Sequence, residues 1–196
     1  MTVRILGIAG SPRKKGNSEM LLDAALEGAA AAGADVEKIR VCDLDIGPCV
    51  ECGGCEKEGI CVIDDEMQGV YPKFLAADVV VIATPMFFMN VPSQLKAFID
   101  RFQCIWARKY VLKQPVREGV ARKPRGVVMA VGGTKGATLF QGLEQLMRVF
   151  FAIMEMEFDK ENSMFLRSID AKGDIGRHET ALDDARKLGE KLAGGA

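Results

Sequence analysis

The sequence has little surplus charge, few aromatic residues and no long apolar run. Its formal net charge is −1 over 196 residues, so it offers no electrostatic attraction to nucleic acid or to a membrane surface, and we expect neither as a partner. No run approaches the roughly 20 apolar residues that a membrane helix needs. The N-terminus lacks the basic and apolar regions of a signal peptide. We therefore expect a cytoplasmic protein.

Catalytic motifs that depend on histidine or on an exposed serine are also missing. His178 is the only histidine, and its place in a polar stretch late in the chain predicts a surface position. No G-x-S-x-G elbow is present, so no histidine-dependent nucleophile can be assembled. The sequence therefore predicts no catalytic side chains, and its chemistry would be carried by cofactors.

Apolar and polar runs alternate along the chain in the pattern of an α/β protein. Strands are expected at 3–9, 35–42, 78–83, 125–131 and within 157–166, and helices at 19–32, 64–76, 93–104, 138–155 and 175–193. Strands that alternate with helices pair in parallel and carry helices on both faces. The predicted fold is a doubly wound three-layer α/β/α sandwich, with a five-stranded parallel sheet in the flavodoxin-like order 2-1-3-4-5. We expect one domain over 1–196, with a cysteine-rich loop insertion at about 47–63.

The stretch from Gly10 to Ser18 joins the first expected strand to the first expected helix. A helix N-terminus in that position is an anion site, because its backbone N–H groups are free and the helix dipole favours negative charge. A Walker loop would need Gly-Lys-Ser/Thr where this chain has Gly-Asn-Ser, and the G-x-G-x-x-G fingerprint is absent. A monophosphate such as that of FMN remains. The candidate ligands are Ser11, Arg13, Gly16, Asn17 and Ser18; the alternative is an ordinary turn in which Asn17 or Ser18 caps the helix.

Two further loops follow expected strands and would lie at the same edge of the sheet. Residues 84–90 follow the third expected strand, and 132–136 follow the fourth. Ligands of doubly wound sheets bind beyond the carboxyl ends of the strands. A flavin ring there needs an apolar wall and backbone donors. The candidates for these roles are Thr84, Pro85, Met86, Phe87, Phe88, Gly132 and Gly133, although the apolar ones could equally be packing residues.

The combined pattern resembles the NAD(P)H-dependent FMN reductases of the flavodoxin-like superfamily. The resemblance rests on Gly10-Ser11-Pro12-Arg13 with Gly16-Asn17-Ser18, on Thr84-Pro85-Met86-Phe87, and on residues 93–101. It implies that Ser11, Arg13, Asn17 and Ser18 hold the FMN phosphate, that residues 85–88 pack on the ring, and that Gly132 and Gly133 line its pyrimidine side. It also implies NAD(P)H as a hydride donor. Relatives usually carry a tyrosine where this chain has Phe87.

Four cysteines form a C-x₂-C-x₂-C-x₅-C pattern within the expected insertion. They are Cys49, Cys52, Cys55 and Cys61. In a reducing compartment such a group favours metal or redox chemistry over disulfides. Thiolates at intervals of three can wrap one face of a cubane, as in ferredoxins. Within this fold the pattern resembles the iron-sulfur flavoproteins, which implies a [4Fe-4S] cluster; free thiols and structural zinc stay open. Cys42 and Cys104 are expected to be small buried residues.

The resulting hypothesis is an iron-sulfur flavoprotein that passes electrons between a [4Fe-4S] cluster and FMN. The alternatives are a cluster-free NAD(P)H-dependent FMN or quinone reductase, and a non-catalytic flavin- or zinc-binding regulatory module. A ferredoxin-type carrier would exchange electrons with the cluster. The segment from Trp106 to Arg125, rich in basic residues and carrying Trp and Tyr, is predicted to contact another subunit of a homodimer or homotetramer.

Overall fold

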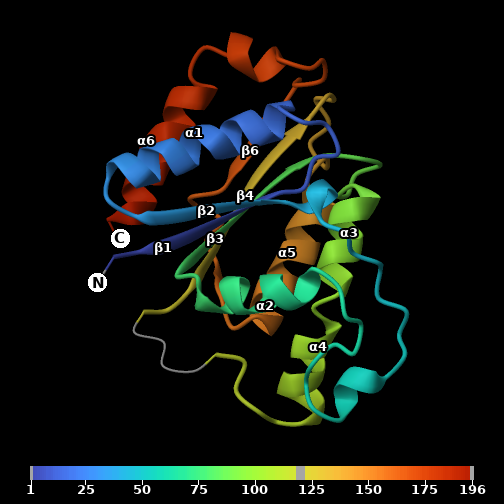
Figure 1. Cartoon of the computed structure of the whole chain (residues 1–196). Helices are drawn as coiled ribbons and strands as arrows, with labels where there is room; N and C mark the ends of the chain where they lie inside the picture. The colour runs from blue at the N-terminus through green and yellow to red at the C-terminus, as the bar shows by residue number, and fades with distance from the viewer. Residues whose placement is uncertain (1, 118–121, 195–196) are drawn as a thin grey trace.

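The computed structural model describes residues 2–117 and 122–194, which form a parallel sheet with helices on both faces (Figure 1). The strands are β1 (Arg4–Ala9), β2 (Asp35–Arg40), β3 (Val79–Pro85), β4 (Arg125–Gly132), β5 (Glu157–Phe158) and β6 (Met164–Arg167). Their order is β2-β1-β3-β4-β5, and all of these pairings are parallel. The predicted fold class and strand order are confirmed. The central strands β1, β3 and β4 are buried almost throughout, because their β-branched and other apolar side chains face helices on both sides.

The fifth position of the sheet holds two short strands where the sequence suggested one weak strand. β5 pairs with the start of β4, and β6 pairs with its end. Between them a turn is fixed by Asp159, whose side chain accepts hydrogen bonds from the backbone and side-chain nitrogens of Asn162. The hydroxyl of Ser163 accepts from the Val128 N–H at 3.0 Å. A serine side chain thus replaces one ladder bond and interrupts the strand.

The helices divide into two layers, each with its own apolar core (Figure 1). They are α1 (Asn17–Ala31), α2 (Met67–Ala76), α3 (Ser93–Asp100), α4 (Gln103–Trp106), α5 (Gln141–Ile153) and α6 (Ala181–Ala193). α1 and α6 cover one face of the sheet, and α2, α3 and α5 cover the other. In the part of the chain that is described, no helix is both long and apolar enough to cross a membrane.

Two glycines let α1 and α6 touch along their backbones. A Cβ added at Gly28 of α1 would lie 2.0 Å from the carbonyl oxygen of Arg186, and one at Gly189 of α6 would lie 1.8 Å from that of Ala25. Neither position can accept a side chain without separating the helices. The first and last helices of the chain are therefore packed as one layer (Figure 1).

Several expected helix boundaries are wrong by a few residues. α1 begins at Asn17 with Gly16 as its N-cap, so neither Asn17 nor Ser18 caps it. α2 begins at Met67, three residues later than expected, and Asp65 accepts the Met67 N–H at 3.1 Å from just outside the helix. Ser93, the natural cap by residue type, is already the first residue of α3. The side chains of Asn17 and Asp65 make tertiary contacts, with Ala171 and Arg101, which local propensity does not report.

The segment after α3 is more helical than the sequence suggests. α4 continues into a π-helical turn at Ala107–Val111. Residues 118–121, part of the predicted subunit-contact segment, lie outside the described residues. Cys104 is buried in this region as expected, whereas Cys42 is only partly buried and lies in a 3₁₀ turn, Val41–Asp43. The last expected helix is split into a 3₁₀ turn, Asp174–Arg177, and α6, with His178 exposed between them.

Candidate functional site

The loops that follow β1, β3 and β4 surround one cavity of about 100 Å³ at the carboxyl edge of the sheet. Ten of the sequence-predicted residues line it: Ser11, Arg13, Gly16, Asn17, Ser18, Pro85, Met86, Phe87, Gly132 and Gly133. Three loops that are far apart in the sequence meet there because parallel strands end at the same edge. The cavity combines the N-terminus of α1 with an apolar wall, the two features that a phosphate-bearing aromatic ligand needs.

Ser18 supplies a free donor in this cavity. Its side chain is 1% exposed, and its hydroxyl oxygen has no hydrogen-bond partner among the described residues. A buried hydroxyl without a hydrogen-bond partner destabilises the folded protein by about 1–3 kcal/mol unless a ligand forms that hydrogen bond. The position of this hydroxyl, on the first turn of α1, fits the phosphate of FMN.

Asn17 lines the cavity, and its side chain also makes contacts that its place in the loop did not suggest. Its side-chain nitrogen donates to the Ala171 carbonyl at 2.8 Å, and its side-chain oxygen accepts from the backbone N–H groups of Gly173 at 2.9 Å and Ile175 at 3.3 Å. The amide is thus engaged in holding the segment after β6 against the start of α1. That segment closes one side of the cavity through Ile169, Asp170 and Lys172.

The buried carboxylate of Glu19 fixes the backbone of residues 10–18, the predicted phosphate loop. Glu19 accepts the Lys15 N–H at 2.8 Å, and it pairs with Lys38 at 3.2 Å and Arg40 at 3.0 Å. Burial opposes ionisation of this carboxyl, but the hydrogen bonds from Lys15 and Lys38 and the charge of Arg40 outweigh it and lower the Glu19 pKa. Lys15 has a positive φ of 53°, a conformation that such an anchored turn can hold.

The loop after β3 presents its apolar residues in two directions. Met86 and Phe87 line the cavity. Phe87 pairs with Asn90 across a tight turn, and the residues between them, Phe88 and Met89, have positive φ angles of 49° and 63°. Phe88 is fully exposed at the tip of this turn. Thr84 is completely buried and donates its hydroxyl to the Pro85 carbonyl. The structure therefore places Thr84 and Phe88 away from the cavity that the other candidates line.

One wall of the cavity comes from residues that were not predicted: Ile169, Asp170 and Lys172. These residues follow β6, the second half of the interrupted fifth strand. A strand of four residues leaves only a faint period-2 signal. The one available signal was topological, since a fifth parallel strand must also end at this edge.

A second cavity, of about 350 Å³, is lined by all four cysteines of the C-x₂-C-x₂-C-x₅-C pattern. Much of its remaining wall comes from Arg101, which directly follows α3, and from α4 with Ala107 after it, including Cys104 and Trp106. Cys52 is exposed, and the other three pattern cysteines are partly buried. Burial raises the pKa of the Cys55 thiol, and the neighbouring thiols add to that rise. Burial also raises the pKa of Cys104, to about 11, so this fifth thiol is held in its neutral form.

The four thiols surround a volume and do not converge on a point. Within 2–117 and 122–194, no group of three or more His, Cys, Asp or Glu side chains is arranged to hold a single metal ion. Zinc needs four donors at about 2.0–2.3 Å from one centre. A cubane has four separate irons, each bound by one thiolate, so its ligands lie around a larger space. The four cysteines therefore share one cavity, and the described residues show no preformed site for a single metal ion within it.

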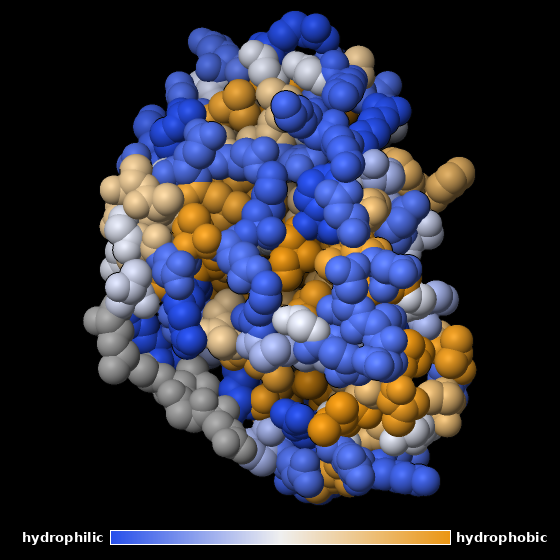
Figure 2. Space-filling view, viewed as in Figure 1, coloured by the Kyte–Doolittle hydropathy of each residue, from blue (hydrophilic) through white to orange (hydrophobic). Residues whose placement is uncertain are grey.

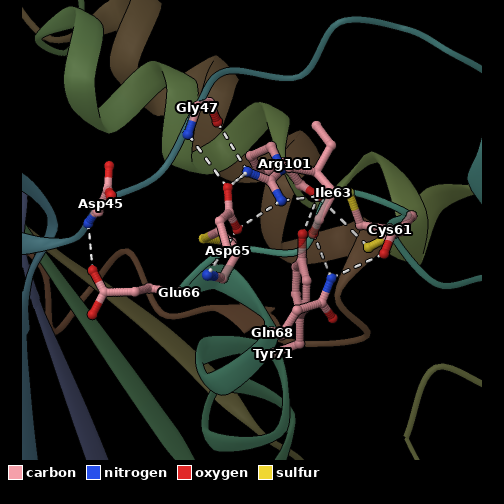
Figure 3. Close-up of polar contacts among 11 residues, drawn as sticks. Asp45, Gly47, Cys61, Ile63, Asp65, Glu66, Gln68, Tyr71 and Arg101 are labelled. Carbon is pink, nitrogen blue, oxygen red and sulfur yellow. Dashed lines mark hydrogen bonds and ion pairs between the residues drawn. The ribbon is translucent and has the colours of Figure 1, made fainter.

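A buried ion pair between Arg101 and Asp65 closes the base of the cysteine segment, residues 47–65 (Figure 3). The side chain of Arg101 is fully buried and contacts Asp65 at 2.5 and 3.0 Å. It also donates to the Gly47 carbonyl at 3.0 Å and to the Cys61 sulfur at 3.5 Å. Hydrogen bonding from Arg101 lowers the Asp65 pKa, with further help from the Met67 and Gly47 N–H groups. Gln68 adds hydrogen bonds to the Cys61 and Ile63 carbonyls.

Apolar side chains border the cysteine cavity on the outer surface. Val50, Ile60 and Val62 are each more than half exposed. Figure 2 shows apolar residues gathered at the lower right of the molecule, the end at which Figure 1 places the cysteine segment and α4. Exposed apolar side chains that cluster in this way mark an interaction surface more often than isolated ones do.

Sequence comparison relates this chain to flavoproteins. The family described as NADPH-dependent FMN reductase matches residues 3–165. An iron-sulfur flavoprotein of Methanocaldococcus jannaschii is 30% identical over 197 aligned residues, covering 97% of this chain and 96% of that protein. An iron-sulfur flavoprotein of Methanosarcina thermophila is 37% identical over 133 residues, which cover 68% of this chain but only 65% of that relative.

Solved structures show the same fold. An NAD(P)H:quinone oxidoreductase from Methanothermobacter marburgensis superposes with a TM-score of 0.75 over 98% of both chains, at 18% sequence identity. A Trp repressor binding protein from Bacillus subtilis is 25% identical, with a TM-score of 0.61 over 94% of this chain and 99% of that one. Together with the strand order, these similarities establish a flavodoxin-like fold.

Proposed function

Because the chain belongs to the NADPH-dependent FMN reductase family, it is a flavin-dependent oxidoreductase, and we propose that it is an iron-sulfur flavoprotein. In this proposal the cavity at the strand ends holds FMN, and the cysteine cavity holds a [4Fe-4S] cluster. Electrons pass between the two groups. Two relatives carry the name iron-sulfur flavoprotein, which supports the proposal without deciding what this chain binds.

The observation that carries the proposal is the common cavity of Cys49, Cys52, Cys55 and Cys61. These thiols lie on a segment with little regular structure that is nevertheless tied down at its base. When bound, a cluster would supply one-electron transfer, and FMN would convert between one- and two-electron chemistry. The protein itself would contribute the four thiolate ligands and the hydrogen-bond donor of Arg101.

In this proposal the residues around the first cavity bind FMN and orient its ring. Ser18 and the backbone N–H groups at the start of α1 would donate to the phosphate, and Arg13 would add a positive charge. Met86 and Phe87 would pack on the ring, and Gly132 and Gly133 would let it approach the backbone at the end of β4. We propose these roles from the geometry of the cavity together with the resemblance.

The test is anaerobic reconstitution of the full chain with iron, sulfide and FMN. We expect about four irons and four sulfides per chain, and a broad absorbance shoulder near roughly 400–420 nm beside the flavin bands. A C49S/C52S variant should keep the flavin bands and lose the shoulder. A C42S variant is the matched control, because Cys42 borders a different hollow on the other side of the cysteine segment. Flavin bands alone in the unsubstituted chain would contradict the cluster.

A cluster-free NAD(P)H-dependent FMN or quinone reductase is the second candidate. The family description favours it, as does a 30% match over 105 residues to an FMN-dependent NADH:quinone oxidoreductase of Pseudomonas syringae. Rapid bleaching of the flavin by NADPH, without iron in the protein, would select this alternative. Colourless protein that retains zinc would instead select the binding-module hypothesis.

We also propose that the chain works as a homodimer or homotetramer and exchanges electrons with a ferredoxin-type carrier. The apolar border formed by Val50, Ile60 and Val62 supports a contact surface beside the cysteine cavity. Light scattering of the purified chain measures its oligomeric state. Reduction of the protein by a reduced ferredoxin, followed by absorbance, tests the carrier.

A further inference from the structure

Both ends of the cysteine segment are fastened to one guanidinium group (Figure 3). Gly47 precedes the first pattern cysteine, and its carbonyl accepts from Arg101. Cys61 is the last pattern cysteine, and its sulfur and the carboxylate of Asp65 accept from the same guanidinium. The Gly47 N–H also donates to Asp65 at 3.3 Å. The 13 residues between Gly47 and Cys61 therefore leave and re-enter the fold at one point.

Arg101 is itself held from behind. Its carbonyl, at the C-terminal end of α3, accepts the hydroxyl of Tyr71 at 2.9 Å and lies 3.6 Å from the Cys104 sulfur. Its Nε is buried and has no hydrogen-bond partner among the described residues. Arg101 also belongs to the wall of the cysteine cavity. The side chain therefore has a fixed position and one donor to spare.

The charge balance at this point is close to neutral. Arg101 carries one positive charge, and Asp65 returns one negative charge directly against it. Reduction of a group in the cavity by one electron adds one unit of negative charge there. A cation and an N–H donor at a thiolate ligand stabilise that charge, and a carboxylate nearby destabilises it. The two members of the pair should therefore act on a bound cluster in opposite directions.

We propose that Arg101 is a positioning residue that closes the base of the cysteine segment and, through its hydrogen bond to Cys61, raises the reduction potential of the cluster. Asp65 holds the guanidinium in place and offsets part of its charge. This inference rests on the proposed function, since the second effect needs a cluster. The closing of the cysteine segment needs no cluster, because its contacts are made by protein atoms alone.

The first experiment measures amide hydrogen exchange by mass spectrometry in the cluster-free chain. In R101Q, peptides within 48–62 should exchange about tenfold faster, since hydrogen bonds to Gly47, Cys61 and Asp65 are lost. Peptides of α1 should not change. The control is R186Q, which removes an exposed arginine that pairs with Asp183 and Glu27 on the opposite face. Unchanged exchange over 48–62 in R101Q would overturn the closing role.

The second experiment is a reductive titration of reconstituted protein, followed by electron paramagnetic resonance. We expect the cluster potential to fall in R101Q and to rise in D65N, while the flavin potential in the same samples stays unchanged. A merely structural role would move both variants in the same direction. Shifts of one sign, or no shift in R101Q, would overturn the tuning role.

The two proposals fail in different ways. If the unsubstituted chain takes up no iron, the proposed function and the tuning role are both wrong, and hydrogen exchange still decides the closing role. If the unsubstituted chain takes up a cluster and the reduction potential of that cluster is the same in R101Q and D65N, the proposed function stands and the tuning role is wrong. Flavin content reports folding of each variant.

Discussion

The phosphate loop, Gly10–Ser18, and the cysteine segment, residues 47–65, hold their shapes by different means. The phosphate loop continues directly from β1 into α1, and one of its anchors is local: the carboxylate of Glu19 accepts the N–H of Lys15, four residues earlier. Its other anchors are distant, since Glu19 also pairs with Lys38 and Arg40, and the Asn17 amide bonds to the segment after β6. The cysteine segment joins a 3₁₀ turn to α2 and has few internal backbone bonds in the described chain, such as Gly59 to Cys55. Its closing contact, Asp65 to Arg101, spans 36 residues of sequence.

The two loops differ in how much of their function can be predicted from the sequence and how much only the tertiary structure shows. A loop that runs directly from a strand into a helix shows its function in a short motif, even though distant residues also hold it. A loop anchored by a distant arginine shows its ligands in the sequence but not what positions them. In both loops a buried charge of one sign is held by opposite charges, Glu19 by Lys38 and Arg40, and Arg101 by Asp65. The phosphate loop is thus fixed by a buried anion and the cysteine segment by a buried cation.

The largest expected effect separates the two loops completely. C49S/C52S should reduce bound iron from about four per chain to near zero, because a cubane needs a thiolate for each iron. The FMN dissociation constant should change by less than about twofold, since neither cysteine borders the other cavity. Iron analysis and fluorescence titration of FMN measure the two quantities. A large loss of FMN affinity would show that the loops depend on each other.

A smaller effect is expected at the phosphate loop itself. S18A should weaken FMN binding by about 10- to 100-fold, the equivalent of one hydrogen bond to a charged group at roughly 1.5–3 kcal/mol. The melting temperature of the FMN-free chain should not fall, because the hydroxyl has no partner there to lose. S93A, at the exposed start of α3, is the control. Unchanged affinity in S18A would remove Ser18 from the proposed site.

The buried anion of the phosphate loop should affect stability in a pH-dependent way. The folded pKa of Glu19 lies below its ordinary value of 4.5, so its stabilising contribution is fully present above about pH 4.5 and is lost as the pH falls through the folded pKa. The free energy of unfolding of E19Q should therefore be about 1–3 kcal/mol lower than that of the unsubstituted chain near pH 7. The difference between the two should shrink in acid. Urea unfolding at pH 7 and pH 4 measures it; a gap that widens in acid would contradict the ion network.

The smallest effect is expected at the tip of the loop after β3. F88A should leave FMN affinity within about twofold, because the Phe88 ring is fully exposed and does not border the cavity. F87A, one residue earlier and lining the cavity, should weaken FMN by about tenfold through lost ring packing. Fluorescence titration compares the two variants. Equal losses would indicate that Phe88 also reaches the ring.

The sequence was sufficient for most of the fold, for reasons that these regions illustrate. The buried run at 78–83 and the anion motif at 10–18 are local signals, and both predictions of position agree with β3 and with the start of α1. The interruption of the fifth strand depends on Ser163 reaching the backbone of Val128, 35 residues away. Such a contact leaves no periodic signal.

The site was predicted less completely than the fold. Residue type and loop position led to Asn17 as a phosphate ligand, and it lines the cavity, but its amide also bonds three backbone groups of the segment after β6, which the sequence did not indicate. Thr84 and Phe88 lie within the motif but not among the residues that line the cavity, since Thr84 is fully buried and Phe88 is fully exposed at a turn tip. Arg101 was visible only as part of a helical pattern. Its role depends on burial, which no single residue type reports.

The backbone contact between α1 and α6 has a consequence for synthesis. Chains emerge from the ribosome N-terminus first, at about 5–20 residues per second, so α1 leaves the ribosome several seconds before α6. Until Gly189 reaches Ala25, the helix that presents the phosphate loop lacks the layer that holds it against the sheet. We therefore expect FMN to load only after translation has passed α6, and the loading of flavin to be a late event in the maturation of each new molecule.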